Sequence, residues 1–254
     1  MQIKLGYTPA STVLKTLSGE HRFALGQLLT MKVLIYYGGL LEQQGRVRPE
    51  MEHMYHTLVK AVELDPYNMD AYYFAQAAFT WDLGQVKAVI KMLKYGYQFR
   101  SWDWYMPFFL GFNYAYFLKD KKEAAHYMQQ AARLSGSELQ TTLASRYFYE
   151  ADQTDVGIMF LRQMLAGAVT ESEKAIYTLR LKALIAVSEL EQAVADYSAS
   201  RGSFPDSLNL LVETKFLEKI PTDPYGGCFY INDKGKIHST SNFSSIFMSK
   251  QNEH

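Results

Sequence analysis

Two histidines three residues apart come closest to the spacing of a metal site. His53 and His56 fall in one predicted helix, with Glu52 and Glu63 nearby. Imidazole and carboxylate are common zinc ligands, and a spacing of three places both rings on one side of a helix. The spacing offers no third ligand, so packing or surface histidines are the simpler interpretation. We keep a metal-binding protein that uses this pair as an alternative, and we predict no metal site and no cofactor.

No other residues have the spacing of a catalytic group. The sequence contains no Gly-rich phosphate loop, no G-x-S-x-G and no H-E-x-x-H. The single cysteine, Cys228, lies in an apolar stretch with no histidine near it, which favours a small buried hydrophobic residue over a nucleophile. We therefore predict no catalytic residues and a protein that is not an enzyme.

An aromatic-rich segment offers the best candidates for contact with a partner. Residues 95–117 hold two of the three tryptophans, and most of these rings are expected in the core. The junction between helices must expose some of them, and exposed aromatic rings beside an arginine are favoured at protein interfaces. The predicted partner-binding residues are Arg100, Trp102, Trp104 and Tyr105, with Tyr72, Tyr73 and Gln76 on the next inner helix face.

Charge and hydropathy argue against two classes of partner. The 26 Lys and Arg residues balance 26 Asp and Glu residues without a basic run, so there is no electrostatic footprint for nucleic acid. The most apolar stretch, residues 23–41, contains Lys32 and two adjacent glycines, and is predicted to be a buried helix. We therefore expect no nucleic acid partner and no direct membrane insertion of this chain, and nothing indicates an oligomer.

The chain repeats with a period near 35 residues. Anchoring the register on Pro66 gives four pairs of residues seven apart, offset from unit to unit by 34, 36 and 35 residues: Met54 and Ala61, Ala88 and Tyr95, Ala124 and Ala131, Met159 and Ala166. Small residues at such positions let two paired helices approach closely. The period therefore predicts a succession of helical hairpins.

This pattern resembles the tetratricopeptide repeat (TPR) family, whose period is about 34 residues. The resemblance is clearest in "LVKAVELDP" (58–66) and "LGFNYAYFLKDKKEAAHYMQQAARL" (110–134). It implies a mainly α fold, an α-α superhelix (TPR-like solenoid) whose concave groove, formed by the first helix of each pair, binds a protein or peptide. About four degenerate hairpins are expected over 35–170, after N-terminal capping helices over 1–34. Before the repeats, a long helix is expected to begin at Ser18 and stop at Gly45.

The sequence pattern changes after the repeats. Thr170 and Glu173 have the spacing of a capping box, which opens a long helix over 171–202. A short helix over 207–213, a turn over 223–226 and a β-hairpin made of "CFYI" and "KIHST" are predicted next. An isolated two-stranded hairpin is only marginally stable, so we expect it to pack on the long helix.

The order of features over 190–241 resembles the globular part of the major pseudopilin of type II secretion systems. The residues that carry the resemblance are Tyr197, Gly202, Phe204, Pro205, Leu208, Leu217, Pro221, Asp223, Pro224, Gly226, Tyr230 and Gly235. It implies a pseudopilin-like cap over 203–254, with a β-hairpin and a flexible tail. Filament assembly is not implied, because helical repeats occupy the place of the pseudopilin's N-terminal hydrophobic helix. Calcium is not expected, because that family's acidic loop has no counterpart.

The sequence therefore predicts a non-enzymatic scaffold that binds a protein or peptide partner. The pseudopilin resemblance favours the bacterial cell envelope, in secretion or pilus-related assembly, with a periplasmic location if an upstream signal was removed and a cytoplasmic one otherwise. The alternative is a cytoplasmic adaptor whose C-terminal unit is only a structural cap. A metal-binding protein that uses His53 and His56 is less favoured.

Overall fold

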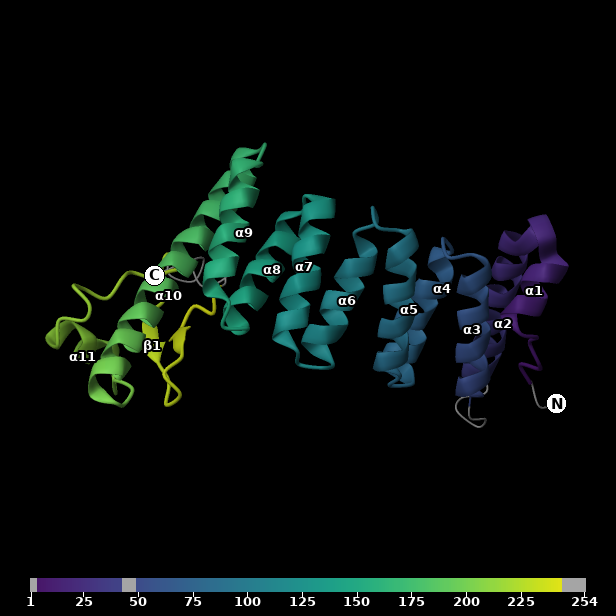
Figure 1. The fold of residues 1–254 in the computed structure, drawn as a ribbon, viewed down its shortest axis with the longest axis horizontal. Coiled ribbons are helices and arrows are strands. Elements are labelled where there is room, and N and C mark those ends of the chain that lie inside the picture. Colours follow the sequence, from purple (N-terminus) through teal and green to yellow (C-terminus); the bar gives the residue numbers. More distant parts are fainter. Residues whose placement is uncertain (1–3, 43–48, 244–254) are drawn as a thin grey trace. The chain divides into compact units, whose positions relative to one another are not determined.

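The computed structural model describes residues 4–42 and 49–243 (Figure 1). Within these ranges the chain is mainly helical, with a small two-stranded antiparallel sheet near the C-terminus. The predicted mainly α class with a C-terminal hairpin is confirmed, and the superhelical arrangement of the helices stays a prediction. The chain divides into two compact units, Met1–Lys119 (unit 1) and Asp120–His254 (unit 2), and we describe each by itself.

Unit 1 contains a succession of helices. They are α1 (Ser11–Ser18), the 3-10 turn η1 (Gly19–His21), α2 (Arg22–Glu42), α3 (Met51–Leu64), α4 (Met69–Phe74), its π-helical continuation η2 (Ala75–Asp82), α5 (Val86–Phe99) and α6 (Tyr105–Tyr116). The first two residue pairs of the repeat fall in α3 and α5. The helix between Asn68 and Asp82 begins with a cap, because the Asn68 side chain accepts hydrogen bonds from the backbone N–H groups of Asp70 and Ala71.

The beginning of unit 1 differs from the prediction in two ways. Ser18 does not cap the long helix: it has helical dihedrals at the end of α1, and its hydroxyl donates to the carbonyl of Lys15 instead. A 3-10 turn intervenes, so α2 begins at Arg22. The expected stop at Gly45 lies outside the described residues. Helix α2 also runs through positions 34 and 35 without a break, so the predicted domain boundary falls inside a helix.

Helix α2 has one buried face and one exposed apolar face. Val33, Tyr36 and Leu40 are buried, as expected for a core helix. The opposite side exposes Leu28, Met31, Ile35 and Leu41. The segment Ser11–Glu42 is long and apolar enough to cross a membrane by length and composition, and 39% of its most apolar window is buried inside the structure. The expectation that the chain does not insert into a membrane therefore stays a prediction.

The close approach of α4 and α5 depends on Gly96. A methyl group on Gly96 would lie 2.5 Å from Cζ of Tyr72, whose ring is fully buried and whose hydroxyl donates to the carbonyl of Pro66 at 3.1 Å. The repeat register assigned the crossing position to Tyr95, which is only half-buried. The small residue at this crossing is its neighbour Gly96, and the repeat register stays a prediction.

In its described residues, unit 2 contains four helices of 13 residues or more, a shorter helix and the C-terminal β-hairpin. Its elements are α7 (Lys121–Ser135), α8 (Glu138–Glu150), α9 (Thr154–Ala166), α10 (Glu171–Arg201), α11 (Leu208–Glu213), β1 (Phe229–Ile231) and β2 (Ile237–Ser239). The predicted capping box of Thr170 and Glu173 is present, and α10 ends at Gly202 with a left-handed φ of 73°. The strands pair antiparallel with Tyr230 opposite His238, joined by a turn in which Gly235 has a φ of 75°.

The hairpin packs on two helices of unit 2. Strand β2 contacts α10, as the sequence analysis predicted. It is also tied to the end of α8, since the Tyr149 hydroxyl donates to the carbonyl of Ile237 and Lys236 donates to the carbonyl of Glu150 at 3.2 Å. Lys236 in addition forms an ion pair with Asp152 at 2.6 Å. The link to α8 is a feature that the sequence did not predict.

A buried carboxylate holds the loop before the hairpin. Asp223 accepts hydrogen bonds from the hydroxyls of Ser239 and Ser241 and, at 2.8 Å, from the backbone N–H of Tyr225. The predicted turn is confirmed by the bond from the Gly226 N–H to the Asp223 carbonyl at 3.0 Å. Cys228 precedes β1 and is exposed, so the expectation of a buried cysteine is wrong. Cys228 is exposed, Phe229 is buried and Tyr230 is exposed, so the alternation along the strand places Cys228 on the same outer face as Tyr230.

Replacing each of two helical glycines of unit 1 by alanine should change the free energy of unfolding in opposite directions. Gly96→Ala forces the buried Tyr72 ring to move, so we expect a loss of about 1–3 kcal/mol in the free energy of unfolding. Gly38→Ala in α2 meets nothing within 4 Å and should raise it by about 0.5–1 kcal/mol, because alanine is the better helix former. Urea unfolding of both variants checks this. A stable Gly96→Ala protein would contradict the close crossing.

Candidate functional site

The histidine pair of α3 does not converge on a common point. His53 Nδ1 lies 3.0 Å from a carboxylate oxygen of Glu50, and His56 Nε2 lies 3.7 Å from one of Glu52. Each ring is thus engaged by a separate carboxylate on the surface. Across residues 4–42 and 49–243, no group of three or more His, Cys, Asp or Glu side chains could hold a metal ion. The metal-binding alternative therefore receives no support from the geometry.

Two of the predicted partner-binding residues are part of the core. Tyr72 is fully buried, and Gln76 is buried in η2. The amides of Gln76 and Asn113 of α6 exchange two hydrogen bonds, at 2.9 and 2.8 Å, so both groups are satisfied internally. Neither residue is available to a partner. The structure corrects this part of the prediction, because a hydrogen-bonding partner 37 residues away is not visible in the local sequence pattern.

The junction between α5 and α6 is organised by Asp103. Its carboxylate accepts two bonds from the Arg100 guanidinium, at 3.0 and 2.7 Å, and a third from the backbone N–H of Tyr105 at 3.0 Å. Arg100 also donates to the carbonyl of Tyr67, and Trp102 stacks on the Tyr67 ring with 61% of its surface exposed. The junction therefore presents Trp102 to solvent, while Arg100 is occupied by structural bonds.

Exposed aromatic rings form a strip along two helices of unit 1. Tyr73 of α4 meets Tyr105 and Phe109 of α6, each with ring centroids 5.5 Å apart. Further along the same helix, in its continuation η2, Trp81 meets Phe112 with ring centroids 6.0 Å apart and Tyr116 with ring centroids 5.3 Å apart. We call these six residues the aromatic strip. Tyr73, Trp81 and Tyr116 expose 41%, 54% and 50% of their surface.

Most of the aromatic strip was missed in the sequence analysis, although a signal was present. Residues 105, 109, 112 and 116 are all aromatic and are spaced by four, three and four, which places them on one face of a helix. The contacts also show the relative direction of the two helices. Tyr73 of α4 meets Tyr105 and Phe109, whereas Trp81 of η2 meets Phe112 and Tyr116, which lie further along α6. The two helices therefore run parallel. Of the predicted residues, Tyr73 and Tyr105 belong to this strip, whereas Trp104 stacks on Tyr105 beside it.

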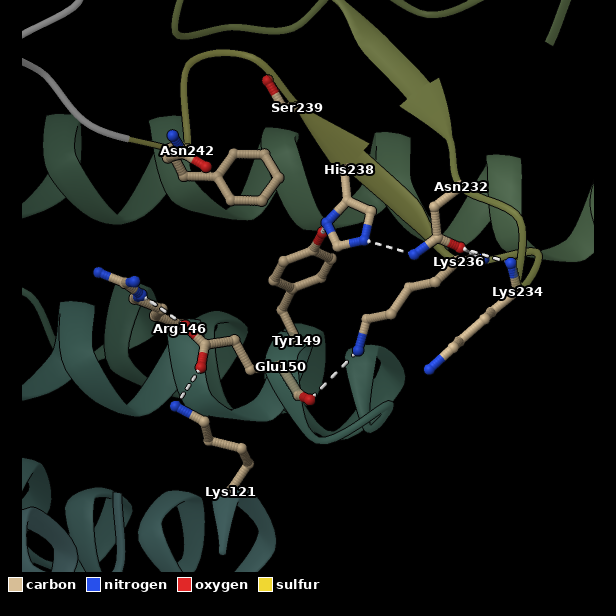
Figure 2. Close-up of a pocket in the computed structure, with 11 residues that line it drawn as sticks. Lys121, Arg146, Tyr149, Glu150, Asn232, Lys234, Lys236, His238, Ser239 and Asn242 are labelled. Atoms are coloured by element: carbon tan, nitrogen blue, oxygen red, sulfur yellow. Dashed lines mark hydrogen bonds and ion pairs between the residues drawn. The ribbon is translucent and has the colours of Figure 1, made fainter. Parts of the chain in front are cut away.

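Unit 2 contains a cleft of about 450 Å³ between α8 and the hairpin, which we call the basic cleft (Figure 2). Lys121 and Arg146 both pair with Glu150, at 2.6 and 2.7 Å. Burial acts to raise the pKa of Glu150, but the hydrogen bonds and charges of Lys121 and Arg146 outweigh it and leave the pKa below its usual value. Lys234 and Lys236 line the same cleft, and Lys236 is paired with Asp152, so the four cations of the cleft are set against two carboxylates, Glu150 and Asp152.

The basic cleft has the chemistry of an anion-binding surface. His238 lies between Tyr149 and Asn232, with Nδ1 3.3 Å from the Tyr149 hydroxyl and Nε2 3.0 Å from the Asn232 amide nitrogen (Figure 2). Burial raises the pKa of Tyr149, so its hydroxyl stays protonated and donates to the Ile237 carbonyl. The side chains come from α7, α8 and the hairpin. Sequence reasoning missed this cleft because its residues are brought together only when the hairpin packs on α8.

The contribution of the Gln76–Asn113 amide pair to stability can be measured with single and double variants. Either Gln76→Leu or Asn113→Leu alone leaves a buried amide without its partner, and we expect a loss of about 2–3 kcal/mol in the free energy of unfolding. The double variant removes both amides and should recover a large part of that loss. A double-mutant cycle by urea unfolding measures the coupling. Additive effects would contradict the paired amides.

No protein-family model matches this chain, and no curated protein matches it either. The resemblances to TPR proteins and to the major pseudopilin therefore rest on the quoted residues of the sequence and stay expectations. The aromatic strip, the basic cleft and the buried amide pair stand on the geometry of this chain alone.

Proposed function

We propose that this protein is a non-enzymatic scaffold that binds a segment of a partner protein along the aromatic strip. The single observation that carries the proposal is the exposure of Tyr73, Trp81 and Tyr116, each between 41% and 54%, on two parallel helices. Two groups of partly exposed rings on the same pair of helices exceed the single scattered apolar side chains that a surface without a partner normally exposes. Tyrosine and tryptophan are also the residues that contribute most often to binding hot spots.

The arrangement of the helices supports a groove-like surface. In stacked helical hairpins the first helices of successive pairs run parallel and together line one face. Helices α4 and α6 hold these positions in the predicted repeats, and their ring contacts run in parallel order. We propose that the strip belongs to the concave side of a TPR-like solenoid. The cell envelope, with a role in secretion or pilus-related assembly, remains the proposed location because of the pseudopilin resemblance.

The contacts of the C-terminal hairpin support a second, structural role. Its hairpin is bonded to the end of α8 through Ile237 and Lys236 and contacts α10. We propose that it covers helices that would otherwise expose their buried faces to water. This role agrees with the adaptor alternative and does not compete with binding at the aromatic strip, because the two surfaces belong to different units.

Peptide selection on the purified full chain tests the proposed binding surface. Peptides selected from a displayed library should bind Trp81→Ala and Tyr116→Ala at least about tenfold more weakly than the wild type, since hot-spot truncations cost about 2 kcal/mol or more. Met159→Ala removes a still more exposed apolar side chain from α9 of unit 2 and is the matched control. Trp102→Ala tests the junction separately.

Two outcomes would contradict this assignment. One is a set of selected peptides whose affinity is the same for the wild type and for both strip variants. The other is an equal loss for the control Met159→Ala, which would indicate non-specific hydrophobic binding. A loss with Trp102→Ala alone would move the binding surface to the junction between α5 and α6. Circular dichroism of each variant checks that the helices stay folded.

A further inference from the structure

Arg180 is a buried cation that no carboxylate of the described residues pairs with. It lies in α10 and is 5% exposed. Arginine is almost never this buried unless it is paired. Within residues 4–42 and 49–243, no carboxylate forms an ion pair with Arg180, and its Nε atom has no hydrogen-bond partner. The guanidinium carbon lies 5.4 Å from the centre of the Tyr225 ring, which is its one aromatic contact there.

The environment of Arg180 disfavours its charge. Burial lowers the pKa of the guanidinium, the Tyr225 hydroxyl acts to raise it, and the charge of Arg146 lowers it further. An arginine does not lose its proton in proteins, so the cost remains as an uncompensated positive charge. A cation is tolerated at such a place when a ligand or ordered water supplies the missing acceptors. Arg180 thus points to an anion as its natural partner.

The guanidinium lines a cleft of about 470 Å³, which we call the arginine cleft. The cleft lies between α8 and α10, and its apolar walls are formed by Leu139, Leu143, Ile176 and Leu179. Arg146 lines it too, and so does Glu138, whose carboxylate is already bonded to the Ser172 hydroxyl at 3.0 Å. The cleft therefore combines apolar walls with a guanidinium that pairs with no carboxylate in the part of the chain that the structure describes.

The number of free charges selects the kind of anion. Two guanidinium groups, those of Arg146 and Arg180, and one carboxylate, that of Glu138, line the cleft, so its lining carries one net positive charge. Arg146 also pairs with Glu150 at 2.7 Å, whereas no carboxylate of the described residues pairs with Arg180. A monoanion is therefore sufficient, and a dianion such as phosphate would need a second free cation. The planar guanidinium fork matches the two oxygens of a carboxylate. The apolar walls fit an aliphatic group attached to it.

We propose that the arginine cleft binds a carboxylate attached to an apolar group, with the Arg180 guanidinium holding the carboxylate and the walls of α8 and α10 holding the apolar group. The C-terminus of an apolar peptide and a small aliphatic acid both have this chemistry. The site lies in unit 2 and involves no residue of the aromatic strip. Its test therefore succeeds or fails independently of the proposed scaffold function.

The first experiment uses the wild-type full chain and needs no variant. Isothermal titration calorimetry compares N-acetyl-leucyl-leucine, the same dipeptide as its C-terminal amide, and octanoate. We expect saturable binding of an acid at one site per chain, with the amide bound at least about tenfold more weakly because a charge-assisted bond is lost. Binding of the dipeptide acid alone identifies a peptide C-terminus as the source. Binding of octanoate identifies a small acid. Equal binding of acid and amide, or no binding of any probe, overturns the proposal.

A matched pair of variants on one helix assigns the binding to Arg180. Arg180→Met keeps an apolar chain of similar length and removes the charge, so the preference for acid over amide should disappear. Arg201→Met removes an exposed arginine from the last turn of the same helix and should keep the preference unchanged. A preference that persists in Arg180→Met overturns the assignment.

Thermal unfolding separates a binding role from a structural one. Without ligand, Arg180→Met should melt at the same temperature as the wild type or higher, because a buried uncompensated charge is replaced by an apolar side chain. Added acid should raise the melting temperature of the wild type and leave that of the variant unchanged. A large fall in the melting temperature of ligand-free Arg180→Met would contradict the proposal. Arg180→Lys, which keeps the charge without the planar fork, should bind the acid with reduced affinity.

Discussion

The hydrogen bond from the Tyr149 hydroxyl to the Ile237 carbonyl is the contact on which the organisation of unit 2 depends. It joins the end of α8 to strand β2 across 88 residues of sequence, and both residues are buried. A two-stranded hairpin is marginally stable by itself, so its order has to come from packing on helices. The bonds of Lys236 to Glu150 and Asp152 reinforce the same junction from its edge. The hairpin is thus held at the helix end by one buried bond and by partly exposed charges.

Both clefts of unit 2 follow from this docking. The segment after β2 supplies Phe243, whose ring packs edge-on against Tyr149 at 5.2 Å and also borders Tyr225 at 6.1 Å. Phe243 lines the basic cleft on one side and the arginine cleft on the other. The buried carboxylate of Asp223 keeps the intervening loop in place. Hairpin docking therefore creates surfaces that neither the helices nor the hairpin would have alone, which is why we place an anion-binding role there and not in unit 1.

The sequence predicted the features that local patterns determine. The 35-residue period placed the helices, the spacing of Thr170 and Glu173 marked the beginning of α10, and the Asp223 turn was read from residue preferences. It failed where the deciding partner is distant in sequence: Gln76 is satisfied by Asn113, and the crossing glycine is fixed by the place of the Tyr72 ring. The basic cleft and the arginine cleft join residues separated by tens of positions, so no local spacing indicates them. Arg180 looks like an ordinary charged residue of an amphipathic helix until its burial is seen.

Amide hydrogen exchange of the hairpin tests most directly whether it is docked on α8. The measurement compares the wild type with Tyr149→Phe, which removes one hydroxyl, and with Tyr230→Phe, which removes a hydroxyl from a half-exposed ring of the same hairpin. Loss of the buried bond should speed exchange across residues 229–240 by roughly tenfold in Tyr149→Phe, in line with a cost of about 1–2 kcal/mol, and leave α5 of unit 1 unchanged. Tyr230→Phe should behave as the wild type. Hairpin amides that exchange in the wild type as fast as in an unstructured peptide, or that keep full protection in Tyr149→Phe, would contradict the account.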